Sequence, residues 1–217
     1  MQTLIYMVRH GESVGNKNRA FLGHTDLPLT EKGEAQARAT AKYLASIGFR
    51  PDIVYASPLC RAYKTTELAL SLIDAPAPIP HNGLREIFAG DWEGELFDDL
   101  DEKYPEERVV WKNDVGHARP ANGESVAELY GRVVSTVLTL AKENLGKTIF
   151  IGAHATPIRA VETYARGYSS DLMCEIPWPT NASVSVYAFD GEHLTPVRYS
   201  FDEFMQDDVA ADHTLKY

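Results

Sequence analysis

The stretch "TLIYMVRHGES", residues 3–13, decides how the rest of the chain is interpreted. It begins with a mostly apolar run, typical of a buried strand, which stops abruptly at Arg9, His10 and Gly11. Ligands of α/β sheets bind just beyond the carboxyl ends of the strands. A cation and a titratable ring at that place indicate a core strand that delivers functional side chains to a site.

Two other stretches have the same character. "DIVYAS" (52–57) and "TIFIGA" (148–153) are predicted to be buried strands, and a helical pattern follows each of them. "SVSVYAFD" (183–190) and "HLTPVRYSF" (193–201) are expected to form a final hairpin. Strands that alternate with helices are typical of a mostly parallel sheet covered on both faces. The expected fold class is therefore α/β.

Local residue patterns also predict where the helices begin. Thr30 is placed as an N-cap, and Ser125 with Glu128 forms a capping-box pair at the start of the longest helix. Ser57 and Pro58 are expected to cap and begin a third helix. The helix after Thr30 is predicted to bury a stripe of residues four apart, namely Ala35, Ala39, Tyr43 and Ile47.

The segment 88–122 breaks the alternation of strands and helices. It is acidic and aromatic, with room for two short helices. An insertion of this length in an α/β domain is often a lid over the site. The chain is therefore predicted to be one domain over 1–217, with 88–122 as a lid-like insertion; the alternative is a small packed subdomain that does not contact the ligand.

Composition excludes several classes of partner. The 217 residues carry 21 Lys and Arg against 31 Asp and Glu, a net charge of −10, so binding to nucleic acid or to an anionic membrane surface is not expected. The two cysteines are too few for a disulfide framework. With no signal-peptide pattern and no apolar run long enough to span a membrane, a cytoplasmic protein is expected. The oligomeric state is left open, a homodimer included.

Neighbouring parallel strands would bring distant residues into one crevice. The first strand delivers Arg9 and His10, the second leads to Arg61, and the third delivers His154. Two guanidinium groups suit the oxygens of a phosphoryl group. The amide of Asn16 adds a donor, and helix starts near Ser57 and Ala155 offer backbone N–H groups. The predicted ligand is therefore a phosphate ester.

His10 turns a binding site into a reactive one. A neutral imidazole nitrogen can attack phosphorus and form a phosphohistidine, and two flanking arginines lower the pKa of the ring, which keeps it neutral. His154 is expected to act as a protonated donor. The poor leaving group of a phosphate monoester needs an acid. "LREIFAGDWEG" offers Glu86, Asp91 and Glu93, and Glu86 is chosen because it lies closest to the strand ends.

Several other residues and motifs carry a weaker signal. His24 in "GHTDLPLT" is interpreted mainly as a loop residue, with substrate contact as an alternative. "GKT" at Gly146 lacks the first glycine of a phosphate-binding loop and precedes a strand instead of a helix. His10 and His154 could bind zinc, but two neighbouring arginines argue against a cation.

At these residues the chain resembles the histidine phosphatase superfamily, also called phosphoglycerate mutase-like. The matching stretches cover nearly the whole chain in the family's order, and they are "VRHGESVGN", "GHTDLPLTEKGEAQA", "YASPLCRAYKT", "LREIFAGDWEG", "GESVAELYGRV", "GAHATPIRA" and "TNASVSVY". The resemblance implies a three-layer αβα sandwich with a mostly parallel central sheet. It also implies catalysis without a metal ion or other cofactor.

Carried over to this sequence, the resemblance implies a role for each matching residue. His10 would be the phosphorylated nucleophile and Glu86 the proton donor. The phosphate pocket would consist of Arg9, Arg61, His154 and Asn16. These roles agree with the chemistry expected from the strand ends.

Two activities share such a site. Phosphatases pass the phosphoryl group to water, whereas cofactor-dependent phosphoglycerate mutases return it to a bound substrate and need extra basic residues. The stretch after Glu86 is acidic and contains the "GDWEG" pattern that resembles the phosphatase branch. The prediction is a phosphatase of small phosphorylated metabolites, with a mutase as the first alternative and a non-catalytic phosphate-binding protein as the second.

Overall fold

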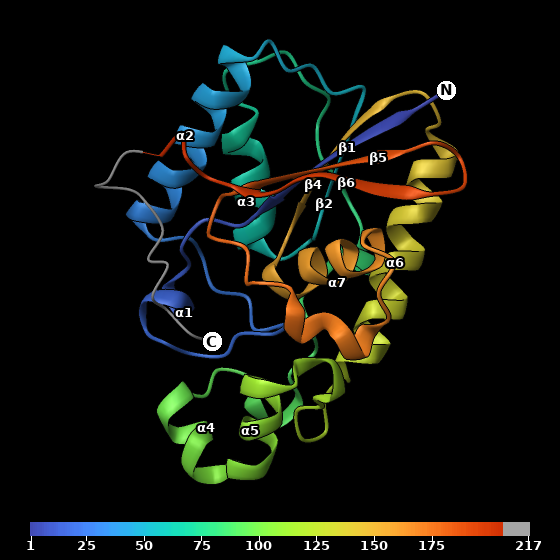
Figure 1. Cartoon of the computed structure of the whole chain (residues 1–217). Helices are drawn as coiled ribbons and strands as arrows, with labels where there is room; N and C mark the ends of the chain where they lie inside the picture. Colours follow the sequence, from blue (N-terminus) through green and yellow to red (C-terminus); the bar gives the residue numbers. More distant parts are fainter. Residues whose placement is uncertain (206–217) are drawn as a thin grey trace.

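In the computed structural model, which describes residues 1–205, the predicted first strand lies inside a six-stranded sheet (Figure 1). The strand order is β3-β2-β4-β1-β5-β6. The strands are β1 (Thr3–Arg9), β2 (Ile53–Ala56), β3 (Ile79–Pro80), β4 (Thr148–Ala153), β5 (Val184–Phe189) and β6 (Leu194–Phe201). Four neighbouring strands, β3, β2, β4 and β1, are parallel, and the β5–β6 hairpin extends the sheet in antiparallel fashion. The expected mostly parallel α/β sheet is confirmed.

The register of the parallel strands aligns their carboxyl ends. Arg9 at the end of β1 pairs with Ala153 at the end of β4, and Ala56 at the end of β2 pairs with Gly152. β4 lies between β1 and β2, because a crossover connection returns the chain to the middle of the sheet. The residues that follow these three strands therefore meet at one edge.

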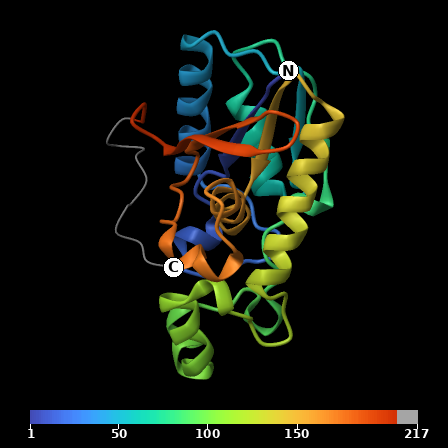
Figure 2. The same cartoon turned by 45° about the vertical axis from the view of Figure 1, so that its right-hand side comes forward.

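Helices cover both faces of this sheet. Figures 1 and 2 show α2 and α3 on one side and α6 and α7 on the other. The α-helices are α1 (Val14–Lys17), α2 (Glu31–Ser46), α3 (Cys60–Ala69), α4 (Phe97–Lys103), α5 (Pro105–Asn113), α6 (Val126–Glu143) and α7 (Ala155–Ala165). The N-cap at Thr30 and the capping box of Ser125 and Glu128 are confirmed. The three-layer αβα sandwich is confirmed as well.

Two hydrophobic cores result from the alternation of side chains along the strands. Ile5 and Met7 of β1 face the core under α6 and α7, whereas Val8 faces the core under α2 and α3. Leu129, Val133, Val137 and Leu140 of α6 are buried in the first core, as their spacing suggests.

The predicted stripe of α2 is wrong. Ala35, Ala39 and Tyr43 are only half-buried, and Ile47 is 48% exposed. Apart from Leu44, the buried face consists of small and polar residues, namely Gly33, Gln36, Ala37, Thr40 and Ala41. Gln36 and Thr40 can be buried because each bonds a distant backbone: Gln36 accepts from the N–H of Glu12, and Thr40 donates to Ala182.

The insertion contains the two expected short helices, α4 and α5. Together they form a lobe at the end of the molecule farthest from α2 (Figure 1). A short 3-10 helix at Gly90–Trp92 precedes them, and another at Val115–His117 follows. None of the helices in the described part of the chain is long and apolar enough to cross a membrane.

Candidate active site

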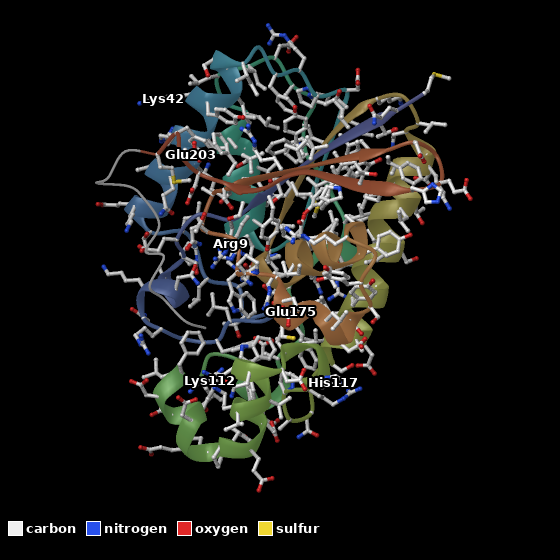
Figure 3. The ribbon with its side chains drawn as sticks, in the orientation of Figure 1. Arg9, Lys42, Lys112, His117, Glu175 and Glu203 are labelled. Atoms are coloured by element: carbon white, nitrogen blue, oxygen red, sulfur yellow. The ribbon has the colours of Figure 1, made fainter. Side chains whose placement is uncertain are left out.

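The aligned carboxyl ends of β1, β2 and β4 border a cavity with about 510 Å³ of empty space, part of it open to solvent. In Figure 3 the labelled Arg9 lies between the sheet and the lobe of α4 and α5. The lining residues come from segments far apart in the sequence and include Arg9, His10, Asn16, Phe21, Arg61, Glu86, Phe97, Trp111, Ala155, Thr156 and Trp178. The structure thus brings together Arg9, His10, Asn16, Arg61, Glu86 and Ala155, as the sequence predicted.

His10 presents one ring nitrogen with a free electron pair. Its Nδ1 lies 2.7 Å from the carbonyl oxygen of Gly11, which only accepts, so Nδ1 carries the proton and Nε2 does not. Gly11 is required here because a Cβ at this position would come within 2.2 Å of the Gly33 carbonyl oxygen. Burial lowers the pKa of His10 well below its ordinary value, and the charges of Arg61 and Arg9 lower it further. The ring is therefore neutral and able to act as a nucleophile.

The two arginines beside His10 are buried and oriented by backbone carbonyls. Arg61 donates to Thr25 at 2.9 Å and to Gly23 at 2.7 Å, and Arg9 donates to Pro179 at 2.5 Å. Burial lowers the pKa of Arg61, but a guanidinium remains charged at neutral pH. Two fixed cations next to a neutral imidazole form a site for a doubly charged anion.

His154 lies against His10, with ring centroids 5.2 Å apart, and is completely buried. Its Nε2 bonds the hydroxyl of Ser57 at 2.8 Å. That hydroxyl oxygen also accepts the N–H of Leu59 at 3.4 Å and, in the tautomer whose ring proton lies on Nδ1, donates its own proton to Nε2. In that tautomer the Nδ1–H has no acceptor among the described residues.

The expectation of a protonated His154 is wrong for this site. Burial lowers its pKa well below the ordinary value, and Arg61, His10 and Arg9 lower it further. A neutral His154 can still donate one hydrogen bond through Nδ1–H. The role predicted for Ser57 is wrong as well: α3 begins at Cys60 after Leu59, and Ser57 contacts His154 instead of capping the helix.

Two further predicted donors lie at the cavity wall. The Asn16 carbonyl oxygen accepts from the backbone N–H and the hydroxyl of Ser13, which fixes the orientation of the amide. Ala155 is the first residue of α7, where helix N–H groups are not paired within the helix. Both places offer neutral donors to an anion held between the arginines.

Glu86 reaches the cavity, whereas the other two candidate acids do not. Its carboxylate accepts the N–H of Ile87 at 2.8 Å and that of Thr156, at the start of α7, at 3.3 Å. Asp91 instead bonds Asn122 on the surface. Glu93 accepts four bonds that tie the 23–25 loop to its own loop.

The backbone of Glu86 is held by two side chains. His24 donates from Nε2 to the carbonyl oxygen of Glu86 at 2.9 Å, and Arg132 on α6 donates to the same oxygen at 3.4 Å. Arg132 also bonds the carbonyls of Gly83 and Arg85 and pairs with Glu124 at 2.7 Å. His24 is not among the lining residues, so the structure places it as a support of Glu86. Arg132 was not predicted, because a charged residue on a helix carries no local sign of its target.

Four aromatic side chains also line the cavity: Phe21, Phe97, Trp111 and Trp178. Phe97 and Trp111 belong to the insertion, on α4 and α5. The sequence pattern predicts the insertion near the site, but it does not indicate that these four aromatic residues line the cavity. Their periodicity resembles that of ordinary core residues, so only the folded chain shows which of them face a cavity.

The arrangement supports chemistry on a phosphoryl group. A neutral imidazole nitrogen, two cations and a carboxylate share one cavity. Among residues 1–205, no group of three or more His, Cys, Asp or Glu side chains could hold a metal ion.

Comparison with known proteins agrees with this geometry. The family model described as "Histidine phosphatase superfamily (branch 1)" matches residues 5–202. Phosphoserine phosphatase 1 of Hydrogenobacter thermophilus is 33% identical over 72% of this chain and 73% of its own. The 2,3-bisphosphoglycerate-dependent phosphoglycerate mutase of Bartonella henselae is 32% identical over 88% of this chain and 95% of its own. The solved structure of Bacillus stearothermophilus YhfR matches with a TM-score of 0.87 at 25% identity, over 94% of this chain and 100% of that one. The resemblance seen in the sequence is thereby confirmed, and the chain belongs to the histidine phosphatase superfamily.

Proposed function

We propose that this protein is a phosphatase that hydrolyses small-molecule phosphate monoesters through a phosphohistidine at His10. The observation that carries the proposal is the state of the His10 ring: its proton is held on Nδ1 by Gly11, and Nε2 is left with a free electron pair beside Arg9 and Arg61. Members of this superfamily are phosphatases or mutases, as the named relatives illustrate.

In the first half-reaction, Nε2 of His10 attacks phosphorus and the bond from phosphorus to the ester oxygen breaks. Arg9 and Arg61 bind the equatorial oxygens, where charge is spread in the transition state. The Nδ1–H of His154, the amide of Asn16 and the N–H of Ala155 supply neutral donors. Glu86, in its protonated form, gives a proton to the departing oxygen.

In the second half-reaction, water attacks the phosphohistidine. Glu86, now a carboxylate, takes the proton of the water as the oxygen bonds to phosphorus. The bond between phosphorus and Nε2 breaks, and its electron pair returns to the ring of His10. One phosphate leaves and both side chains recover their starting states, so the cycle needs no metal ion and no cofactor.

Mutase activity is the first alternative. A mutase must also hold the carboxylate or second phosphate of its substrate, which needs cations outside the phosphoryl pocket. Within the described residues 1–205, Arg9 and Arg61 are the only Lys or Arg that line this cavity, and both lie beside His10. The lining therefore favours transfer to water. A non-catalytic binding protein is disfavoured because His10 and Glu86 face the same cavity.

The insertion is proposed to cover the bound ester within a single domain of 1–217. Phe97 and Trp111 bring it to the cavity wall, which supports contact with the ligand over the alternative of a separate packed subdomain.

The function is tested by phosphate release from a panel of monoesters and by trapping of the phosphorylated protein at alkaline pH. The His10→Ala variant should lose both signals, whereas His117→Ala, at a side chain 62% exposed on the surface, should keep both. Isomerisation of phosphoglycerate faster than phosphate release would identify a mutase. Binding of phosphate with neither reaction would identify a binding protein.

A further inference from the structure

Apart from the residues that the proposed reaction uses, the cavity lining is mostly apolar and aromatic. This lining limits the kind of alcohol that the substrate can carry. Phe21, Phe97, Trp111 and Trp178 line the cavity together with Ala20 and Leu22. The charged lining residues are Arg9, Arg61 and Glu86, all of which the proposed reaction uses. Among residues 1–205, no further Lys or Arg lines the cavity to bind an acidic group on the leaving alcohol.

The aromatic wall is fixed in place before any ligand binds. Trp111 lies edge-on to Phe21 at 5.0 Å and stacks on Trp178 at 6.0 Å with an interplanar angle of 27°. The buried Arg159 guanidinium lies 3.9 Å from the centre of the Trp178 ring, and Arg108 lies 5.3 Å from that of Phe97. Rings held by such contacts lose little freedom when a ligand binds.

The electrostatic surroundings disfavour an acidic leaving group. Phe97 is followed directly by Asp98, which pairs with Arg19 at 3.4 Å, and by Asp99, and both carboxylates are exposed in the first turn of α4. A carboxylate on the leaving group would lose its hydration against aromatic rings without gaining a cation. A neutral ring would instead bury apolar surface and stack on the wall.

We infer that the substrates are phosphate monoesters of neutral alcohols with an aromatic or similarly apolar body, an inference that rests on the proposed function. The phosphoryl group lies between Arg9 and Arg61, and the body of the alcohol contacts Phe97, Trp111 and Trp178. This distinguishes the chain from relatives whose names include phosphoserine or phosphoglycerate, because both of these esters carry a carboxylate on the alcohol.

The inference is tested with four alkyl esters: 2-phenylethyl phosphate, ethyl phosphate, O-phosphoserine and 3-phosphoglycerate. We expect kcat/KM for 2-phenylethyl phosphate to exceed that for each of the others by about tenfold or more, because burial of a benzene ring readily supplies such a factor. Alkyl esters are used so that the comparison reflects binding of the alcohol rather than an activated leaving group.

The Phe97→Ala variant should reduce the ratio of 2-phenylethyl to ethyl phosphate by about threefold or more. Val109→Ala, on α5 with a side chain 59% exposed and outside the cavity, should keep the wild-type ratio. Trp178→Leu provides a second test of the wall should Phe97→Ala fail to fold.

The outcomes separate this inference from the proposed function. A preference for phosphoserine or phosphoglycerate, or a ratio that Phe97→Ala and Trp178→Leu leave unchanged, overturns the inference while phosphate release still supports a phosphatase. Absence of phosphate release from every ester, together with absence of a phosphohistidine, overturns the proposed function itself.

Discussion

Two buried histidines that stay neutral should make the stability of this protein depend on pH. The pKa values of His10 and His154 both lie well below the ordinary value of 6.5, mainly because of burial and the nearby arginines. In the unfolded chain the same rings bind a proton as pH falls below 6.5, whereas in the fold they do not. The unfolded state then binds more protons, so stability is complete above pH 6.5 and falls as pH decreases toward the folded pKa values.

The magnitude follows from the ordinary pKa. At pH 5, about 1.5 pH units below 6.5, protonation of one unfolded histidine favours unfolding by about 2 kcal/mol relative to pH 7 and above. The two rings together contribute at most about 4 kcal/mol, the value reached when both stay neutral in the fold throughout this interval. This is a large fraction of the 5–15 kcal/mol that is typical of a domain.

The assay is urea unfolding of the wild type and of His154→Asn at pH 7 and at pH 5. Carboxylates and exposed histidines contribute equally to both proteins, so the difference between the two pH-dependent losses isolates one ring. The wild type should lose about 2 kcal/mol more than His154→Asn over this interval. His10→Asn gives the same comparison for the other ring. Equal losses in the wild type and in both variants would falsify the view that these rings are neutral when buried.

Three other predictions concern the reaction. Glu86→Gln should slow hydrolysis of alkyl phosphates by about a hundredfold or more and that of 4-nitrophenyl phosphate much less, because a good leaving group needs no proton; similar losses for both esters would count against Glu86 as the acid. Arg132→Leu should lower kcat for alkyl phosphates by about tenfold with KM little changed and should spare 4-nitrophenyl phosphate, since Arg132 acts by positioning Glu86; an equal fall for both esters would indicate a general loss of structure. Dialysis against EDTA should leave kcat/KM unchanged, and recovery of lost activity by added metal would contradict the metal-free reaction.

Much of the active site could be predicted from the sequence, because the relevant signals are local. One buried strand stops at Arg9 and His10, and another stops at His154. These strand ends mark the carboxyl edge of a parallel sheet, whatever position the two strands have in the strand order. Glu86 is favoured over Asp91 and Glu93 because it follows a short apolar stretch and lies closer to the strand ends, and the structure places its carboxylate at the cavity. The caps at Thr30 and Ser125 depend only on residues within one turn.

The tertiary structure decided what depends on partners distant in the chain. The protonation state of His154 is set by complete burial beside Arg61 and by the hydroxyl of Ser57, 97 residues away. The buried face of α2 could not be predicted from hydrophobicity, because Thr40 is buried through a bond to a carbonyl 142 residues away. The aromatic wall likewise joins Phe97 and Trp178 across the fold. Sequence alone thus determined which chemical groups stand at the strand ends, and folding determined their charge, their neighbours and the shape left for a substrate, since burial and long-range contacts exist only in the folded chain.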